Sequence, residues 1–349
     1  MSKETIGTDG FEFVEFTSPD PDCLRDGFEK LGFSLVGKHR SKNVHLYQQN
    51  DISFILNGEP DTQASLFAAE HGDSANAMAF RVQDARRAVE IAERRGATRV
   101  EASVGPMELS IPAILGVGGS LIYLVDRYGD QTIYDVDFHL HKKRNVSPPG
   151  PLSHVDHLTH NLKRGNLMKF ADFYEQVFEF HEAQRFQIQG IQTGLVSKAM
   201  TGACGKLRIP LNESADDKSQ IEEYLQRYHG EGIQHIALHT DDIYSAVDRL
   251  RRNGIDFQTT PDTYYEMLGD RVKEHGQDVA EMQKRQILID GSPEEGYLLQ
   301  IFTQDMIGPI FFEIIQRLGN TGFGEGNFQA LFESVERDQQ RRGVLSETV

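Results

Sequence analysis

Apolar residues along this chain follow either the alternating spacing of a strand or the three-to-four-residue spacing of a helix. The same order of these two spacings occurs in both halves of the chain. Residues 10–33 and 153–180 each begin with alternating apolar and polar positions and continue, after a turn, with apolar positions at helical spacing. Residues 76–98 and 233–255 repeat this order, with an Asp just before an amphipathic helix. Repeated units of strand, helix and further strands predict an α+β fold built by duplication.

Further segments of the second half are rich in apolar or β-branched residues and are bounded by Gly, Pro or Asn. They span residues 190–200, 206–212, 296–304 and 308–317. We expect them to form one curved sheet. Beyond them, Asn327 can cap a terminal helix with Phe328, Leu331, Phe332 and Val335 on its apolar face. The glycine-rich turn at residues 319–327 lacks the Lys-Ser/Thr ending of a phosphate loop, so it does not predict one.

A proline-rich break separates the two halves. Residues 145–151, NVSPPGP, cannot continue a helix or a central strand. The chain has 349 residues, which is more than one ordinary core requires. We therefore expect one domain at residues 1–145 and a second at residues 151–349.

Composition and charge exclude several classes of function. The formal charge of −17 would repel a phosphate backbone, so we expect no nucleic-acid partner. No apolar run approaches the roughly 20 residues of a membrane span, and the first residues carry no secretory signal, so we expect a cytoplasmic protein with no membrane role. Cys23 and Cys204 are too few for a disulfide framework and are expected to be reduced. A small-molecule ligand is favoured by elimination.

The most informative polar residue is Glu313, in the run GPIFFEIIQR. A carboxylate among Phe and Ile residues is costly to bury without a partner, and no Lys or Arg precedes Arg317 in this segment. A divalent metal ion is one source of compensating charge. A hydrogen-bonded or partly exposed glutamate is the alternative that this residue alone leaves open.

Histidines that could join Glu313 occur in two other predicted strands. They are His154, His157 and His160 in SHVDHLTH, and His235 and His239 in IQHIALHT. Alternation turns His157 away from its two neighbours, and His235 and His239 are roughly 13 Å apart along a strand, so each strand can give one ligand to one metal. Each histidine alone is more often structural, and the first half has Ala77 where the second has His235.

Two histidines and one carboxylate on separate strands form the set expected for a facial triad. Such a triad leaves three positions of an octahedral iron(II) open on one side. His157, His235 and Glu313 are the candidates for this set.

Longer motifs occur in the order DHLTHN, GEGIQHIALHTDDI, LLQIF, FFEIIQR and GFGEGNFQALFESVE. Together they resemble the 4-hydroxyphenylpyruvate dioxygenases over nearly the whole chain, and most closely from residue 154 to residue 335. The resemblance implies two vicinal-oxygen-chelate domains, each of paired βαβββ modules that form an open barrel-like sheet with outer helices. It also implies a C-terminal lid helix, and iron in the second domain only.

The resemblance implies roles for individual residues. Iron(II), Fe(2+), would be bound by His157, His235 and Glu313. Strand alternation supports pocket positions for Gln300 and Phe302, which share a face, but places Gln234 on the face opposite His235. The positions that match the family's substrate site are Ser197, Asn212, Gln220, Gln234, Gln300, Phe302, Phe311, Phe323, Asn327 and Phe328.

The implied reaction converts 4-hydroxyphenylpyruvate and O2 to homogentisate and CO2 by oxidative decarboxylation, ring hydroxylation and side-chain migration, as in tyrosine and phenylalanine catabolism. The substrate's own 2-oxo acid would chelate the iron, so no 2-oxoglutarate is needed. One alternative is a 4-hydroxymandelate synthase, a sister enzyme that usually has a smaller aliphatic residue where this chain has Phe328. Another is a chelate-fold binding protein that is not an oxygenase. Family habit implies a homodimer or homotetramer.

Overall fold

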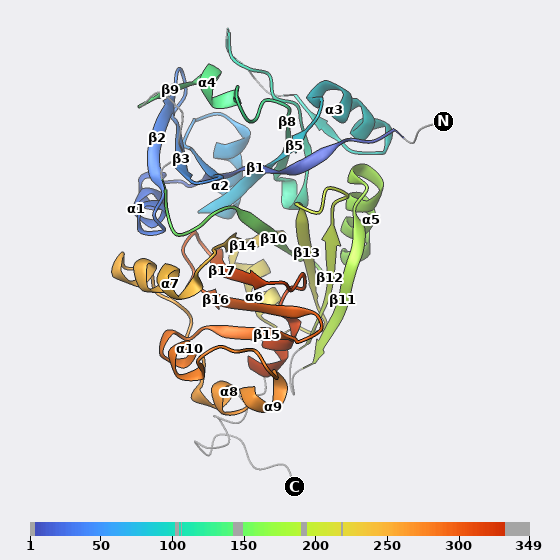
Figure 1. Ribbon diagram of the computed structural model, residues 1–349. Coiled ribbons are helices and arrows are strands. Elements are labelled where there is room, and N and C mark those ends of the chain that lie inside the picture. Colours follow the sequence, from blue (N-terminus) through green and yellow to red (C-terminus); the bar gives the residue numbers. More distant parts are fainter. Residues whose placement is uncertain are drawn as a thin grey trace.

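The structure is a computed structural model that describes residues 4–101, 105, 107–141, 149–189, 194–217 and 219–331. Within these residues the strands form two mixed sheets, one from each half of the chain. In Figure 1 the first half, from blue through cyan to green, lies above the second, from green through yellow to red. The predicted α+β fold is confirmed. The predicted domain boundary falls largely on residues 142–148, which lie outside the described residues, and it stays a prediction.

The first sheet has nine strands in the order β6-β7-β8-β5-β1-β4-β3-β2-β9. Its strands are β1 (Thr8–Thr17), β2 (Ser34–His39), β3 (Val44–Gln49), β4 (Ile52–Asn57), β5 (Ser74–Val82), β6 (Arg99–Val100), β7 (Ala113–Leu115), β8 (Leu121–Val125) and β9 (Phe138–Leu140). The helices of this half are α1 (Asp22–Lys30), α2 (Gln63–His71), α3 (Ala85–Arg94), the 3-10 turn η1 (Val117–Gly119) and α4 (Ile133–Asp137).

The second sheet has eight strands in the order β11-β12-β13-β10-β14-β17-β16-β15. Its strands are β10 (Val155–Leu162), β11 (His181–Gln189), β12 (Gly194–Thr201), β13 (Arg208–Ser214), β14 (Gly232–His239), β15 (Leu288–Ser292), β16 (Gly296–Phe302) and β17 (Phe311–Leu318). The helices are α5 (Leu167–Phe178), α6 (Gln220–Arg227), α7 (Ile243–Arg252), α8 (Asp262–Glu266), α9 (Leu268–Arg271) and α10 (Val279–Arg285).

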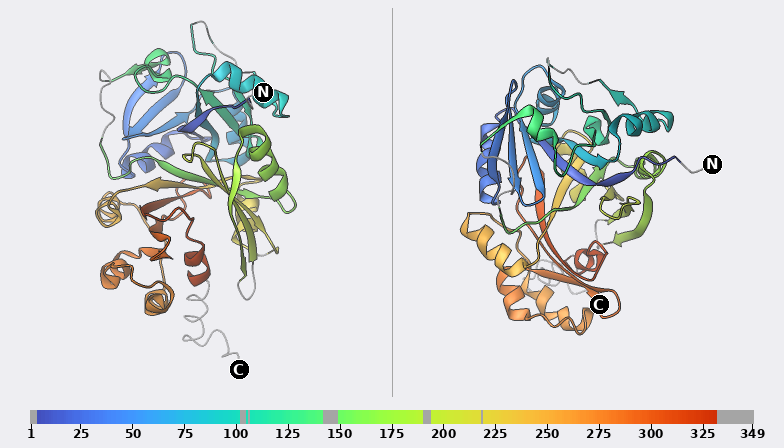
Figure 2. Two further views of the ribbon diagram at one scale, coloured as in Figure 1. Left: turned by 45° about the vertical axis from the view of Figure 1, so that its right-hand side comes forward. Right: turned by 45° about the horizontal axis from the view of Figure 1, so that its top comes forward.

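A short helix begins after the second sheet, at residue 325, and is called the terminal helix below. It begins two residues before Asn327, so the prediction that Asn327 caps it is wrong; the Asn327 side chain bonds Tyr264 and Gln300 instead. Its described part ends at Leu331, so the predicted apolar positions Phe332 and Val335 lie outside the described residues. Both views in Figure 2 show that the second sheet is strongly curved and that this helix, in red, lies on its concave side. The predicted curved sheet of the second half is therefore confirmed.

The two sheets share one pattern of strand pairing, as expected for a duplication. Strand β1 runs parallel to β4 and antiparallel to β5, and β5 runs parallel to β8. Strands β10, β13, β14 and β17 repeat these relations in the same order. By this pairing, the first-sheet positions that correspond to the three predicted ligands are Phe13, Ala77 and Tyr123. The Phe13 and Tyr123 rings lie 5.5 Å apart, so apolar packing occupies the equivalent place in the first half.

Aromatic side chains join the two halves into one core. Phe54 of β4 approaches Phe312 of β17, with ring centroids 5.8 Å apart, and Phe80 of β5 meets Phe178 of α5 at 5.1 Å. All four are fully buried, and each buried ring of this size stabilises the fold by roughly 1.5–3 kcal/mol. The first half therefore supports the back of the sheet that carries the predicted ligands.

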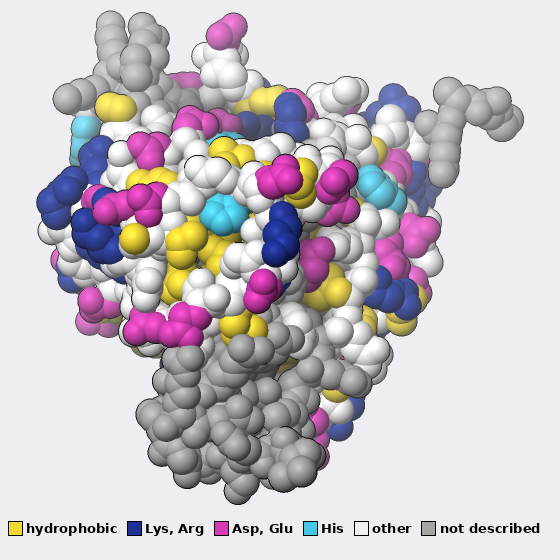
Figure 3. Space-filling view, turned by 60° about the horizontal axis from the view of Figure 1, so that its bottom comes forward, with side chains coloured by type: hydrophobic (Ala, Val, Ile, Leu, Met, Phe, Trp, Pro, Cys, Tyr) yellow, Lys and Arg dark blue, Asp and Glu magenta, His cyan; other side chains and the backbone are white. Residues whose placement is uncertain are grey.

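None of the described helices is long and apolar enough to span a membrane. On the face shown in Figure 3, acidic side chains are spread among the basic ones, so the described part of that face offers no continuous basic surface.

Candidate metal centre

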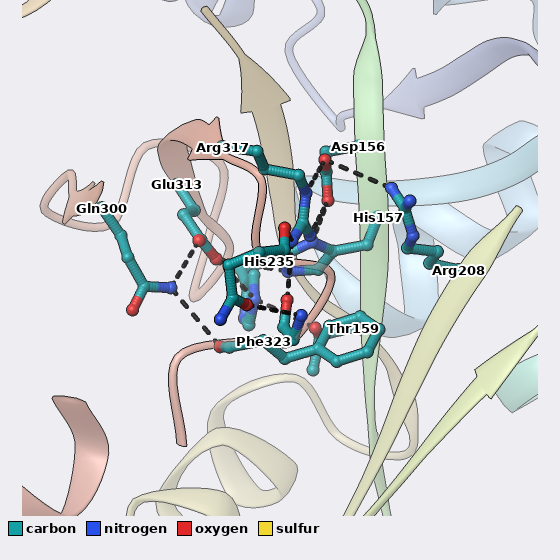
Figure 4. A network of polar contacts seen from close by, with 11 residues as sticks. Asp156, His157, Thr159, Arg208, His235, Gln300, Glu313, Arg317 and Phe323 are labelled. Atoms are coloured by element: carbon teal, nitrogen blue, oxygen red, sulfur yellow. Dashed lines mark hydrogen bonds and ion pairs between the residues drawn. The ribbon is translucent and has the colours of Figure 1, made fainter. Parts of the chain in front are cut away.

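Three neighbouring strands bring the predicted ligands together. His157 lies on β10, His235 on the adjacent β14, and Glu313 on β17 beyond it. One ligand atom from each residue lies within 4.8 Å of the others, and all three side chains are buried. The Oε2 atom of Glu313 is 3.2 Å from Nε2 of His157 and 3.4 Å from Nε2 of His235. Figure 4 shows the three side chains converging from their strands.

Each histidine of the cluster follows a shift in strand register. The pairing of β10 with β14 skips Asp156 on one strand and Gln234 on the other, which is the pattern of a β-bulge. Asp156 Oδ1 accepts a hydrogen bond from Nδ1 of His157 at 2.8 Å, and Gln234 Oε1 accepts one from Nδ1 of His235 at 2.6 Å. A bulge interrupts the alternation of side chains, so the expectation that Gln234 would lie away from His235 is wrong. Gln234 orients the imidazole from behind.

Asp156 is a buried carboxylate that fixes the orientation of the His157 imidazole through its Nδ1 atom. Arg317 donates from Nη2 to Oδ1 and from Nε to Oδ2 of Asp156, both at 2.7 Å, and Arg208 lies 3.4 Å away. Burial alone would raise the pKa of Asp156, but Arg317 and His157 hold that pKa well below its usual range. The ionised carboxylate keeps the proton of His157 on Nδ1 and leaves Nε2 free to bind a metal.

Glu313 is ionised in spite of its burial. Desolvation raises its pKa, but the two histidines lower it more strongly, to about 2. Burial lowers the pKa of His235; the pKa of His157 is raised because Glu313 and Asp156 outweigh the effect of burial. Two imidazole nitrogens and one carboxylate, oriented from behind by hydrogen bonds, are the donor set that a divalent transition metal requires. The three residues therefore fit the predicted metal.

A small cavity opens over the three predicted ligands. It is lined by His157, Thr159, Phe186, Leu195, Ser197, Pro210, Asn212, His235, Glu313, Phe323 and Phe328. Ser197 and Asn212 are register partners on β12 and β13. The Ser197 hydroxyl is buried and has no hydrogen-bond partner within the described part of the chain.

Several predicted pocket residues lie next to this cavity rather than in its lining. Phe311 stacks on the His235 imidazole at 5.0 Å, and Phe302 lies between His235 and Phe328, 6.4 and 6.0 Å away. Gln300 and Asn327 lie behind Glu313, linked by a 2.7 Å hydrogen bond.

Gln220 does not lie where the sequence predicted. It is the first residue of α6, and its side chain is exposed and absent from the cavity lining. The helix turns its apolar positions Ile221, Tyr224 and Leu225 into the core, which leaves Gln220 facing outward.

The other histidines of these strands lie outside the cluster, as strand alternation predicted for His154 and His160 and as the spacing along the strand predicted for His239. His160 is buried on the opposite side, where its Nε2 is 2.7 Å from the Tyr174 hydroxyl. His154 and His239 stack on each other at 4.5 Å.

Sequence reasoning missed Asp156, Thr159 and Arg317. Thr159 shares the face of His157, and its Oγ1 lies 2.9 Å from Nε2 of His235. Arg317 lies four residues after Glu313 on the same face of β17. Strand alternation could therefore have placed Thr159 and Arg317 on the side of the predicted ligands. Asp156 immediately precedes a ligand, but only the bulge lets it contact His157.

Two protein-family models match this chain. Residues 3–139 match "Hydroxyphenylpyruvate dioxygenase, HPPD, N-terminal", and residues 154–278 match "Glyoxalase/Bleomycin resistance protein/Dioxygenase superfamily". Among curated relatives, the 4-hydroxyphenylpyruvate dioxygenase of Pseudomonas aeruginosa is 57% identical, covering 97% of both chains. A protein named Hemolysin VllY, from Vibrio vulnificus, is 58% identical over 98% of both chains.

Solved structures agree with these matches. A mutant of 4-hydroxymandelate synthase from Streptomyces coelicolor superimposes with a TM-score of 0.83 at 27% identity, covering 95% of this chain and 99% of its own. A fusion of a xylose isomerase-like TIM barrel with a 4-hydroxyphenylpyruvate dioxygenase gives a TM-score of 0.80 at 32% identity, covering 96% of this chain and 53% of its own. The predicted vicinal-oxygen-chelate fold is confirmed. With relatives this similar along nearly its whole length, the chain belongs to the 4-hydroxyphenylpyruvate dioxygenase family.

Proposed function

We propose that this protein is a 4-hydroxyphenylpyruvate dioxygenase that converts 4-hydroxyphenylpyruvate and O2 to homogentisate and CO2. One observation carries the proposal: the buried cluster of His157, His235 and Glu313 opens into a cavity with an aromatic wall. A relative that is 57% identical over nearly the whole chain bears the name of this enzyme.

His157, His235 and Glu313 would hold iron(II). When bound, this ion supplies the Lewis acidity and the dioxygen activation that the reaction needs. Asp156 and Gln234 fix both imidazoles through Nδ1, so that the two Nε2 atoms face Glu313. A site held in this way needs little reorganisation on metal binding.

The cavity walls would orient the substrate along one direction. We place the 2-oxo acid at the three ligands and the phenol hydroxyl near Ser197 and Asn212, because these lie on strands β12 and β13, away from β17. A buried hydroxyl without a partner is costly in the free enzyme, and a substrate hydroxyl would satisfy it. Ser197 is therefore a contact that the phenol end would complete.

The aromatic residues would hold the ring and exclude water. Phe323 and Phe328 line the cavity, and Phe302 lies behind Phe328 at 6.0 Å. Phe323 also meets the His157 imidazole edge to face at 5.4 Å, so its ring closes the cavity beside a metal ligand. Keeping bulk water out of such a site protects reactive species from side reactions.

A 4-hydroxymandelate synthase is the second candidate, because one solved enzyme of that name shares this fold at a TM-score of 0.83. Phe328 favours the dioxygenase, since a large ring at this place narrows the room beside the reacting carbon. We also propose that the enzyme works in the cytoplasm and that it forms a homodimer or a homotetramer. Light scattering on the purified protein would measure its mass in solution and so distinguish the two oligomers.

Product analysis tests the proposal. The iron(II)-loaded protein is given 4-hydroxyphenylpyruvate and oxygen, beside Glu313→Ala and a control, Glu15→Ala, which removes a buried carboxylate from the first sheet. We expect homogentisate from the native chain and the control, and none from Glu313→Ala. Formation of 4-hydroxymandelate would assign the chain to the sister enzyme, and absence of oxygen uptake would reject both activities.

A further inference from the structure

A chain of hydrogen bonds leads from Glu313 away from the cavity to Arg271, the last residue of α9. Gln300 donates from Nε2 to Oε1 of Glu313 at 2.7 Å, and Asn327 donates from Nδ2 to Oε1 of Gln300, also at 2.7 Å. Oδ1 of Asn327 accepts from the Tyr264 hydroxyl at 2.6 Å and from Nη2 of Arg271 at 3.1 Å. Gln300, Asn327 and Tyr264 are buried. Figure 4 shows the end of this chain at Gln300 and Glu313.

The direction of this chain is set at both ends. A guanidinium can only donate hydrogen bonds, and an ionised carboxylate can only accept them. Asn327 must therefore turn its carbonyl oxygen to Arg271 and its NH2 group to Gln300. Gln300 must turn its carbonyl oxygen to Asn327 and its NH2 group to Glu313. Every donor along the chain points from Arg271 toward the metal-binding carboxylate.

Tyr264 keeps the same direction. Its hydroxyl accepts from Nη2 of Arg271 at 2.6 Å, and the guanidinium lies 5.1 Å from the centre of its ring. Burial raises the pKa of Tyr264 to about 12, although Arg271 opposes the shift. The phenol therefore stays protonated at neutral pH and remains a donor to Asn327.

The same arginine ties down the start of the terminal helix. Arg271 Nη1 lies 3.2 Å from Oδ1 of Asp290, and Oδ2 of Asp290 accepts from the backbone N–H of Gly326 at 2.8 Å. A Cβ atom at Gly324 would lie 1.9 Å from Oε1 of Gln300, and one at Gly326 would lie 2.3 Å from Oδ1 of Asp290. Glycine at these two positions thus lets the helix approach the hydrogen-bond chain closely. A larger residue at Gly324 or Gly326 would clash with the side chain of Gln300 or Asp290.

Gln300 also gives the two carboxylate oxygens of Glu313 different environments. Oε1 of Glu313 is occupied by the Gln300 amide, whereas Oε2 faces the Nε2 atoms of His157 and His235. Without the amide, both oxygens would be available on the side of the ligands. The hydrogen-bond chain therefore selects one oxygen for metal binding.

We propose that Arg271, which lies outside the cavity, is a positioning residue for Glu313 and acts on it through Asn327 and Gln300. The packing of the terminal helix and the orientation of the Glu313 carboxylate are then coupled, because Asn327 belongs both to the helix and to the hydrogen-bond chain. This inference rests on the proposed metal site. Loss of Arg271 weakens metal binding and loosens the terminal helix together.

The test compares Arg271→Met with Arg271→Lys and with Arg285→Met. Lys is also a donor-only cation and restores part of the effect, whereas Arg285 pairs with Asp248 at 2.8 Å, away from this chain, and serves as the control. The readouts are cobalt(II) affinity by titration calorimetry and hydrogen exchange of the backbone amides at residues 325–331. We expect Arg271→Met to bind cobalt(II) roughly tenfold more weakly, the lower end for residues that orient a ligand, and to exchange faster at the helix.

A second variant separates the two effects. Asn327→Asp can still accept from Arg271 and Tyr264, so it keeps the tie to the helix, but it offers no donor to Gln300. We expect weaker cobalt(II) binding with unchanged exchange at residues 325–331. Asn327→Asp tests the link from Asn327 to Gln300. Where Arg271→Met fails to fold, Arg271→Lys tests the arginine itself, because an ammonium lacks the planar fork of the guanidinium and restores only part of the cobalt(II) affinity.

The outcomes are distinguishable. A native chain that binds no cobalt(II) would reject the proposed metal site itself. A native chain that binds it, with Arg271→Met and Asn327→Asp binding equally well, would overturn only the role of Arg271. Faster exchange in Arg271→Met without any change in affinity would also overturn it, because the arginine would then hold the helix alone.

Discussion

Replacing Asp156 with Asn tests how far the proposed metal site depends on a residue that would not bind the metal itself. Asp156 is 1% exposed, and its carboxylate holds Nδ1 of His157 at 2.8 Å and the guanidinium of Arg317 at 2.7 Å. An amide of the same shape keeps one acceptor but turns an N–H group toward Arg317, which can only donate. We therefore expect both a looser imidazole and a destabilised fold.

The two effects have different sizes. Partners that orient a metal-binding histidine are worth about 10- to 100-fold in metal affinity, or about 1.4–2.7 kcal/mol. Leaving Arg317, with a side chain that is 12% exposed, without its anion costs about 3 kcal/mol of folding free energy. Asp156→Asn should therefore lose about 1.4–2.7 kcal/mol of metal-binding free energy and about 3 kcal/mol of folding free energy.

A matched control exists in the first sheet. Glu12 precedes Phe13 as Asp156 precedes His157, at an equivalent register shift, and it pairs with Arg81 at 2.6 Å. Glu12→Gln removes a buried carboxylate from an arginine pair far from the three predicted ligands and should not affect metal binding. Its loss of folding free energy should be smaller than that of Asp156→Asn, because Arg81 keeps its pair with Asp51 at 2.9 Å. Urea unfolding in the presence of a chelator measures the folding free energy, and calorimetric titration with cobalt(II) measures metal binding.

The reasoning is refuted by an Asp156→Asn variant whose cobalt(II) affinity equals that of the native chain. It is also refuted if Glu12→Gln weakens cobalt(II) binding to the same degree, because the loss would then follow general destabilisation.

Other variants test the cavity and a buried charge. Ser197→Ala should keep its melting temperature, since the hydroxyl has no partner within the described residues, while KM rises by about tenfold for one lost hydrogen bond; an unchanged KM would count against the phenol contact. Phe328→Ile should shift the ratio of homogentisate to 4-hydroxymandelate measured by chromatography, and unchanged products would contradict its place beside the ring. Burial raises the pKa of Glu15, so its ionisation costs stability that develops as the pH rises above the ordinary value of about 4.3. Glu15→Gln should therefore melt at a higher temperature than the native chain at pH 8 and lose this advantage below pH 4; a difference independent of pH would reject the assignment.

Local patterns along the chain were enough to predict the fold class and to limit the metal site to Glu313 and one histidine from each of two strands, and the family resemblance then selected His157 and His235. Alternation places His157 on one face of β10 and His154 and His160 on the other, and this needs no knowledge of the partner strand. Glu313 was recognisable because an isolated carboxylate in an apolar strand requires compensation. These signals lie within one element each, and the duplicated order of elements supplied the α+β architecture.

Tertiary structure alone decided which residues surround the three predicted ligands. Gln234 contacts His235 because a bulge interrupts the pairing of β10 with β14, and Gln220 faces outward because α6 packs by its apolar side. Asp156 and Arg317 are 161 residues apart in the sequence and meet at 2.7 Å. Such contacts depend on strand register, bulges and helix packing, which are set by the pairing of distant segments, so no spacing within a single element could predict them.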